Sequence, residues 1–403
     1  MARSSNKFFA GRMDASTRSD CYVEVEIKRA GGITLVLESK VGSLYGESIR
    51  SLLTEVCSAL GITDAAFRII DQGALPYVLA ARIETSVKRA LPRLTAEFLP
   101  PARQHRKPVN PKGRHRRTRL YLPGTEPKFF PNAGLHHPDM IVLDLEDSVA
   151  PAEKDSARLL VRNALRVLDF YGAERGVRIN QGRLGREDIR TIVPQKPDII
   201  LLPKCEDADT VRDVDREIRP LEKRGDAGPE ILLLPIIESA LGVVNAYAIA
   251  SASPRVCALA IGLEDYTADI GVERTSDGRE SLFARMTIMN AAKAAGVQAL
   301  DSVTSDVDDL EGLSASTRES RALGFDGKGC IHPRQIKVIH SAFEPAAHEI
   351  EKAKLIVAAA EEARRLGSGV VAMGTKMIDA PVVIRAECVL RLAEELEKER
   401  AAQ

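Results

Sequence analysis

Short apolar runs recur along residues 119–336, and most are followed by a helical pattern of apolar positions. The runs are RLYLPG (119–124), MIVLDLEDSV (140–149), GVRIN (176–180), DIILLPK (198–204), EILLLPIIES (230–239), CALAIGLED (257–265), VQALDSV (297–303) and GCIHPRQI (329–336). Eight such units over about 250 residues predict a (β/α)₈ TIM barrel whose strands are buried on both faces. An open doubly wound sheet is the less favoured alternative, because no G-x-G-x-x-G follows any of the runs.

A different pattern precedes the repeats. CYVEVEI and ITLVLES alternate on either side of a Gly-containing turn, which predicts two half-buried strands. Residues 46–60 have helical spacing that stops at Gly61, then FRIID predicts a strand and YVLAARIETSVKRAL a second helix. We therefore expect a small α+β domain over residues 21–95.

The remaining segments complete the expected organisation. Residues 1–20 are polar and are expected to be mobile, and residues 96–118 form a basic linker that contains several prolines. The barrel is expected over 119–345. Residues 346–403 are expected to form a C-terminal lid and helix.

Composition narrows the class of protein. The 403 residues include 57 basic and 57 acidic side chains, no Trp, and 44% hydrophobic residues. This composition suits a folded multi-domain chain and gives no reason to expect a nucleic-acid partner, although the basic linker alone could form a charged patch. No apolar run is long enough to span a bilayer, and six widely spaced cysteines favour reduced thiols. We expect a cytoplasmic protein without a membrane partner.

Charged residues follow the predicted strands, and catalytic groups of barrels lie at the carboxyl ends of strands. These positions hold Asp144, Glu146, Asp147, Arg178, Lys204, Glu238, Asp265 and Asp301. Carboxylates without a Cys or His pair suit a hard cation such as Mg²⁺, and Arg178 or Lys204 could hold an anionic substrate. The alternative is that each charge merely solvates the rim. Two roles are compatible with Glu146: it could bind the metal directly, or it could orient a neighbouring Arg or Lys.

Ten motifs in series make the second part recognisable. RLYLPG, DLEDSVAPAEKDSAR, VRIN, LLPK, IIESALG, IGLEDYTADIG, FARMTI, LDSVTSD, GFDGKGCIHPRQI and GTKMIDAPV resemble the citrate lyase β-subunit family, within the HpcH/HpaI aldolase superfamily. This family comprises metal-dependent hydroxyacyl-thioester lyases and includes malyl- and citramalyl-coenzyme A lyases. The resemblance covers about residues 116–400.

The resemblance implies a set of site residues. Glu238 and Asp265 correspond to the Mg²⁺ ligands, and Arg178 to the substrate-binding arginine. Asp379 corresponds to an acid/base carboxylate that a neighbouring subunit supplies, which implies a homotrimer or a hexamer. Glu146 and Lys204 join Arg178 and Asp379 as candidate catalytic residues. The candidate contacts on the thioester side are Arg119, Gly327, Lys328, Ile331 and His332.

The first module resembles a second family, the acyl carrier γ-subunit of citrate lyase, through GITLVLESKV, YGESI, DQGALPYVLAARIE and VKRAL. In that family a phosphopantetheine-type group is attached to a Ser just before the first strand. Here Arg18 stands at the expected position. Ser19, displaced by one residue, and Ser16 are the candidates for attachment.

The resemblance implies a carbon–carbon lyase that cleaves a 3-hydroxyacyl thioester with Mg²⁺. One reading is cleavage of a citryl-carrier thioester to acetyl-carrier and oxaloacetate, which the fused carrier domain favours. The second is cleavage of free malyl- or citramalyl-coenzyme A, which Arg18 favours. A non-catalytic carrier or assembly subunit is a third. An acyl-transferase subunit remains open as a partner.

Overall fold

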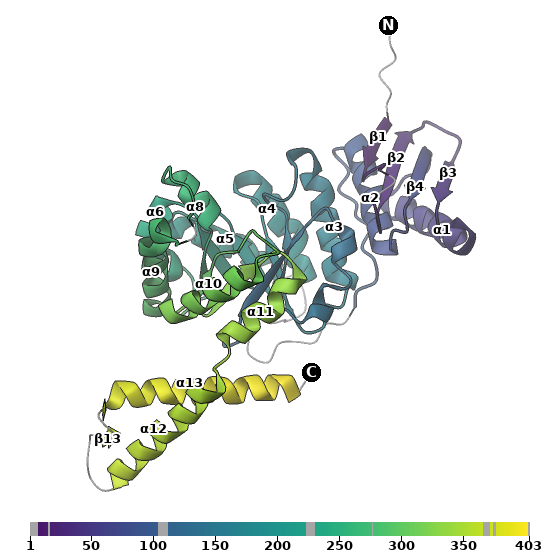
Figure 1. The fold of residues 1–403 in the computed structure, drawn as a ribbon. Helices are drawn as coiled ribbons and strands as arrows, with labels where there is room; N and C mark the ends of the chain where they lie inside the picture. Colours follow the sequence, from purple (N-terminus) through teal and green to yellow (C-terminus); the bar gives the residue numbers. More distant parts are fainter. Residues whose placement is uncertain are drawn as a thin grey trace.

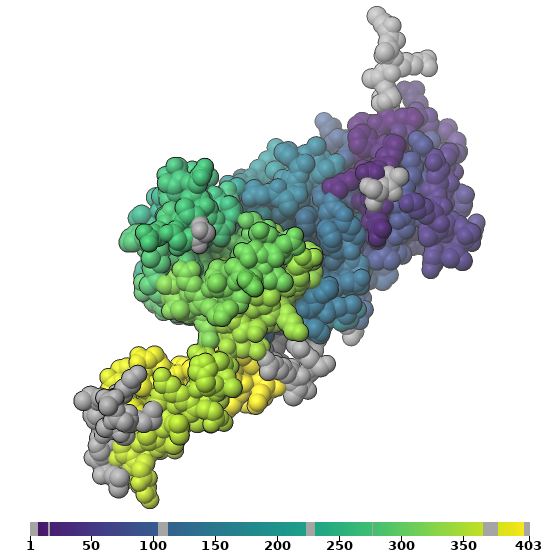
Figure 2. Space-filling model, in the orientation of Figure 1, coloured from purple at the N-terminus to yellow at the C-terminus, as the bar shows by residue number. Residues whose placement is uncertain are grey.

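The computed structural model describes residues 7–14, 17–103, 112–222, 230–275, 277–365, 371–373 and 376–401. Figure 1 shows three parts in chain order. A small amino-terminal module (residues 7–90) lies beside a barrel (residues 118–343), and a helical arm (residues 347–401) projects from the barrel. Figure 2 shows the arm as a separate lobe of the molecule.

The strands and helices have the following bounds. The strands are β1 Lys7–Ala10, β2 Cys21–Ile27, β3 Ile33–Ser39, β4 Ala65–Asp71, β5 Thr118–Pro123, β6 Met140–Asp144, β7 Glu174–Arg178, β8 Ile199–Leu202, β9 Leu232–Ile237, β10 Ala258–Ile261, β11 Gln298–Asp301, β12 Gly327–Cys330, β13 Val371–Met373 and β14 Lys376–Ile378. The α-helices are α1 Gly42–Leu60, α2 Pro76–Ala90, α3 Lys154–Val167, α4 Gly182–Ile192, α5 Ala208–Glu222, α6 Ala240–Val244, α7 Ala246–Ala250, α8 Leu263–Asp269, α9 Arg279–Ala294, α10 Leu310–Leu323, α11 Pro333–Phe343, α12 Ala347–Arg365 and α13 Ala380–Ala401.

The module is a four-stranded sheet in the order β1-β2-β4-β3, with α1 and α2 packed on one face. Gly61 ends α1 in the left-handed region at φ 70°, which suits a residue without a Cβ. Pro76 occupies the first turn of α2, where a missing backbone N–H costs no hydrogen bond.

The expectation of a mobile segment over residues 1–20 needs a correction at Lys7–Ala10. These residues form β1, which pairs antiparallel with β2, with Lys7 opposite Glu26 and Ala10 opposite Val23. A four-residue strand is too short for an alternating pattern to reveal it. Pairing with the edge of the sheet nevertheless satisfies its backbone groups.

The barrel is closed and all-parallel, in the order β10-β11-β12-β5-β6-β7-β8-β9. One apolar cluster fills the inside of the barrel, and another lies between the strands and the outer helices. Strands with two buried faces read as continuous apolar runs, which is why the sequence marks them. The predicted TIM-barrel fold and its eight strands are confirmed.

The basic end of the expected linker belongs to the barrel. Arg116 forms a fully buried ion pair with Glu174 (Nη2 to Oε1, 2.7 Å), and Arg117 pairs with Asp139 (2.8 Å). Both arginines are neutralised inside the fold, so they do not contribute to a free basic surface.

The arm is a hairpin of α12 and α13 with a small apolar core of its own, joined by β13 and β14. A hydrogen bond between His115 Nε2 and Glu395 Oε2 (3.1 Å) links it to the segment before the barrel. Within the described ranges, we find no helix with the length and apolar character needed to cross a membrane.

Candidate active site

Asp144 and Arg178 form the first pair of the site. They lie opposite each other in register at the ends of β6 and β7. Arg178 donates two parallel hydrogen bonds, from Nε to Asp144 Oδ1 (2.7 Å) and from Nη2 to Oδ2 (2.8 Å). Burial alone would lower the pKa of Arg178, but Asp144 outweighs it and raises the pKa, so the guanidinium stays charged.

Lys204 lies after β8 and brings further carboxylates together. Its Nζ is 3.2 Å from Glu146, 3.3 Å from Asp147 and 3.7 Å from Asp265. Burial opposes the charged form, yet Glu146 and the other carboxylates raise the pKa of Lys204. Burial in turn raises the pKa of Glu146, and its hydrogen bond to Asp147 raises it further. The ammonium group is therefore the centre of an acidic cluster.

Glu238 lies directly after β9 and is 6% exposed. Its Oε2 accepts the backbone N–H of Lys204 (2.8 Å). A Cβ at Gly262 would stand 2.4 Å from Glu238 Oε1, so only glycine leaves room for the carboxyl group. Burial raises the pKa of Glu238 to about 7, and the nearby Asp265 carboxylate adds to this effect.

These oxygen donors fit a magnesium ion. Glu238 and Asp265 both approach Lys204, through its backbone N–H and its ammonium group respectively. Among the described residues, no group of three or more His, Cys, Asp or Glu side chains is arranged as a complete metal site. Mg²⁺ commonly uses one or two carboxylates and fills its other positions with water and substrate oxygens. Two carboxylates beside the half-buried Arg178 suit that mode of binding.

The predicted thioester-side residues do not all reach the strand ends. Arg119 is buried inside the barrel and does reach the end of β11, where its Nη2 donates to the Asp301 carbonyl (2.9 Å), while its Nε and Nη1 have no hydrogen-bond partner among the described residues. Lys328 lies 3.7 Å from Asp301 and is buried. Arg285 of α9 and Ser320 of α10 also hydrogen-bond Asp301, so Asp301 and Lys328 face the outer helices.

The residues in and after β12 also lie at different ends of the barrel. Gly327 is at the amino end of the strand, where a Cβ would stand 1.9 Å from the carbonyl oxygen of Arg116. Ile331 and His332 follow the carboxyl end of β12 and lie at the rim. His332 caps α11, since its Nδ1 accepts the backbone N–H of Arg334 (3.2 Å).

The other predicted residues are not part of this cluster. Asp379 is exposed at the start of α13, on the arm, and accepts the backbone N–H of Val382 (3.3 Å). In Figure 1 the arm is well separated from α6 and α8, the helices that follow β9 and β10 at the strand ends. Ser19 lies in the module, and Ser16 lies outside the described residues.

Two neighbours of the cluster were not predicted. The Tyr121 ring lies under the Arg178 guanidinium, with 5.6 Å between the ring centroid and Cζ. Lys154 donates to the carbonyls of Leu145 (2.8 Å) and Glu146 (2.6 Å) and so fixes the acidic turn. The inward register of β5 could have indicated Tyr121, but no local signal indicates Lys154.

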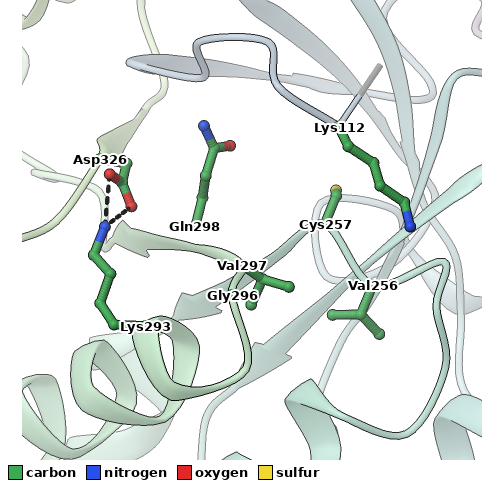
Figure 3. A pocket seen from close by; sticks show the side chains of 8 residues that line it. All are labelled: Lys112, Val256, Cys257, Lys293, Gly296, Val297, Gln298 and Asp326. Atoms are coloured by element: carbon green, nitrogen blue, oxygen red, sulfur yellow. Dashed lines mark hydrogen bonds and ion pairs between the residues drawn. The ribbon is translucent and has the colours of Figure 1, made fainter. Parts of the chain in front are cut away.

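Figure 3 shows a hollow of about 290 Å³ at the opposite, amino ends of β10 and β11. Lys112, Lys293, Gln298 and Asp326 contribute its polar groups. Lys293 is already paired with Asp326 (2.7 Å), and the hollow shares no residue with the cluster at the strand ends.

The fold and the site thus define a barrel enzyme with an acidic, arginine-containing site at its strand ends. Residues 117–333 match the family model described as HpcH/HpaI aldolase/citrate lyase. The chain is 44% identical to citrate lyase subunit beta of Leuconostoc mesenteroides subsp. cremoris, over 70% of this chain and 94% of that protein. The chain belongs to the HpcH/HpaI aldolase/citrate lyase family, as the motifs predicted, and it is a carbon–carbon lyase.

Two further relatives extend the comparison. Mitochondrial citramalyl-CoA lyase of Mus musculus is 34% identical, over 75% of this chain and 94% of that protein. The crystal structure of CitE from Mycobacterium tuberculosis, in complex with magnesium, acetoacetate and coenzyme A, is 32% identical. It covers 70% of this chain and 98% of that one, with a TM-score of 0.59.

The module has a match of its own. Residues 7–90 match the acyl carrier family model described as malonate decarboxylase delta subunit. This agrees with the predicted fusion of a carrier-like domain to the lyase barrel.

Proposed function

We propose that this protein is a Mg²⁺-dependent lyase that cleaves a 3-hydroxyacyl thioester into a keto acid and a shorter acyl thioester. The observation that carries the proposal is the convergence of Glu238, Asp265, Lys204 and Arg178 at the strand ends. The relatives support it, since they include citrate lyase β-subunits and a structure with magnesium and coenzyme A.

Glu238 and Asp265 would hold the metal. When bound, Mg²⁺ would polarise the hydroxyl and carboxylate oxygens of the substrate. Arg178 offers a fixed positive charge to the negative charge that develops during cleavage, because Asp144 holds its guanidinium in place. Glu146 and Asp147 in turn hold the Lys204 ammonium beside the same site.

The reaction breaks one carbon–carbon bond and moves one proton. The substrate hydroxyl loses its proton to solvent and becomes the carbonyl of the keto acid, while the leaving carbon of the thioester takes up a proton, so no proton is gained or lost overall. Asp379 is the proposed donor to that carbon. Because Asp379 lies on the arm, away from the cluster of its own chain, we propose that another copy supplies it.

The surface beside the site supports an oligomer. Helix α9 packs against α6 and α7, and these three helices carry a set of exposed apolar side chains that we treat as one apolar patch: Leu241, Val244 (81% exposed), Tyr247, Leu282 and Phe283 (78% exposed). Exposed apolar patches of this kind mark protein–protein contacts. We propose that the arm of a second copy covers the patch, in a homotrimer or a hexamer.

The six unpaired cysteines support a location in the cytoplasm.

Two thioester classes are candidates. The β-subunit relatives favour a citryl thioester that gives oxaloacetate, and an acyl-transferase subunit would accompany a carrier-bound substrate. The citramalyl-CoA lyase relatives favour a free coenzyme A thioester.

The test is keto-acid release by the purified chain from citryl-, malyl- and citramalyl-coenzyme A and from a citryl-carrier protein. Magnesium should be required, and a chelator should abolish release. Undiminished release in chelator, or no release from any of the thioesters with magnesium present, would overturn the proposal.

A further inference from the structure

Helix α2 belongs to both the module and the barrel. Every residue from Tyr77 to Val87 is buried, which is unusual for a helix on the surface of a small domain. Leu79, Ala80, Ile83 and Val87 pack into the core of the module. Tyr77, Val78 and Ala81 pack into the core of the barrel. A module that detached from the barrel would expose this second apolar face.

Two ion pairs, one fully buried and one partly exposed, join α2 to α3 at the same contact. Arg162 of α3 donates from Nη2 and Nη1 to Glu84 of α2 (2.7 and 3.0 Å), and both side chains are at most 1% exposed. Arg89, near the end of α2, pairs with Asp155 of α3 (2.6 Å). If α2 left α3, both ion pairs would break, and Glu84 would keep only Lys88 of its own helix as a partner (2.8 Å).

The segment before β2, which contains the candidate attachment residue Ser19, is tied to the barrel through Arg82 of α2. Asp20, the last residue before β2, accepts from Arg82 Nε (2.9 Å) and Nη2 (2.7 Å), and both side chains are 2% exposed. Arg82 Nη2 also reaches the carbonyl of Thr125, just after β5 at the rim of the barrel (3.4 Å). A second ion pair joins Arg12 to Glu126 in the same rim segment.

The contact continues toward the site. Gly124, beside Thr125, donates its backbone N–H to the Asp144 carbonyl (2.8 Å), and Asp144 holds Arg178. The module therefore braces the rim segment that adjoins the site.

We propose that the module stays fixed to the barrel and stabilises its rim, and that it does not act as a mobile acyl carrier. A carrier that serves two active sites must leave one to reach the other, whereas this module shares a helix with the barrel. This proposal rests on the proposed lyase function. It implies that the substrate is a phosphopantetheine thioester that comes to the site from outside the chain.

Thiol labelling of the full-length protein tests the docking independently of activity. Ala81 is fully buried in the contact, so Ala81→Cys is made in a Cys388→Ser background that removes the exposed native thiol. The internal controls are Cys57 in the core of the module and Cys330 in the barrel. Under native conditions, a maleimide should modify the introduced thiol no faster than these two. Labelling about tenfold faster or more, with both controls protected, would show that the module detaches. Val78→Cys repeats the test if Ala81→Cys does not fold.

The source of the thioester needs a second measurement. The chain isolated from its native host should have its unmodified intact mass and should release keto acid from thioesters added in solution. Activity with a coenzyme A thioester or only with a separate carrier protein distinguishes the two sources. A prosthetic group on the module whose loss abolishes cleavage would overturn the inference. Protection of the introduced thiol with no activity on any thioester would instead overturn the lyase function.

Discussion

At the scale of single residues, the site depends on two carboxylates in different surroundings. Glu238 is buried beside Gly262, whereas the Asp265 side chain, beside the Lys204 ammonium group, is 43% exposed. We expect Glu238→Gln to preserve the shape of the pocket, remove a charged oxygen ligand, and lower Mg²⁺-dependent keto-acid release by at least about 100-fold. Turnover measured across a magnesium titration checks this.

Glu264→Gln is the matched control. Glu264 precedes Asp265 in the sequence, but its carboxylate is 57% exposed and pairs with Arg274. We expect this variant to keep wild-type turnover. Equal losses in Glu238→Gln and Glu264→Gln would argue against a specific metal role for Glu238.

At the scale of elements, Arg82 of α2 anchors Asp20 in the segment before β2 and also reaches the barrel rim at the Thr125 carbonyl. Arg82→Ala leaves Asp20 buried without its guanidinium, and we expect a loss of about 3–5 kcal/mol in the free energy of unfolding. Chemical denaturation measures this loss. Arg68→Ala removes an exposed pair with Glu38 and should cost at most about 1 kcal/mol. If both variants lose the same stability, the Asp20 pair is not a special anchor.

The layer outside β11 should make stability depend on pH in the acid range. Burial alone would raise the pKa of Asp301, but Lys328, Arg285 and Ser320 lower it from 3.8 to about 2. A lowered folded-state pKa gives stability that is complete above pH 3.8 and is lost as pH falls through about 2. Between pH 4 and pH 2, the free energy of unfolding of Asp301→Asn should fall by about 2 kcal/mol less than that of the wild type. Chemical denaturation at the two pH values measures this difference. Asp308→Asn, at an 82% exposed carboxylate, should keep the wild-type slope.

Elements and site were predictable to different degrees. The apolar runs identified seven barrel strands because each is buried on both faces, whereas the eighth run, 329–336, overlaps β12 only at Gly329 and Cys330. The sequence GKGC of β12 does not show which of its residues face the inside of the barrel, because its two glycines have no side chains that could reveal an alternation. As a result, the outward direction of Lys328 could not be predicted. The cluster around Lys204 was predictable from strand ends alone, whereas Arg82 and Asp20 meet only through packing of distant segments.

At the scale of the whole molecule, the arm and the cluster should act together only between copies. We expect Glu238→Gln and Asp379→Asn each to be nearly inactive as separate proteins. After subunit exchange, a mixture should regain part of the activity, because some sites combine an intact cluster with an intact arm. Keto-acid release before and after mixing measures this, with light scattering to confirm the oligomer. No recovery in a mixture proven to exchange would place Asp379 outside the shared site.

Helix α2 also sets an order of events during synthesis. Its barrel-facing side is complete once Ala90 has been made, but α3, which covers it, ends at Val167. At about 5–20 residues per second, this interval lasts roughly 4–15 s on the ribosome. During this interval the nascent chain exposes the barrel-facing apolar side of α2, and the Glu84 carboxylate lacks its partner Arg162 of α3. Early folding of this protein is therefore a period of exposure to chaperones and to misassociation, which ends only when α3, the first α-helix of the barrel, emerges.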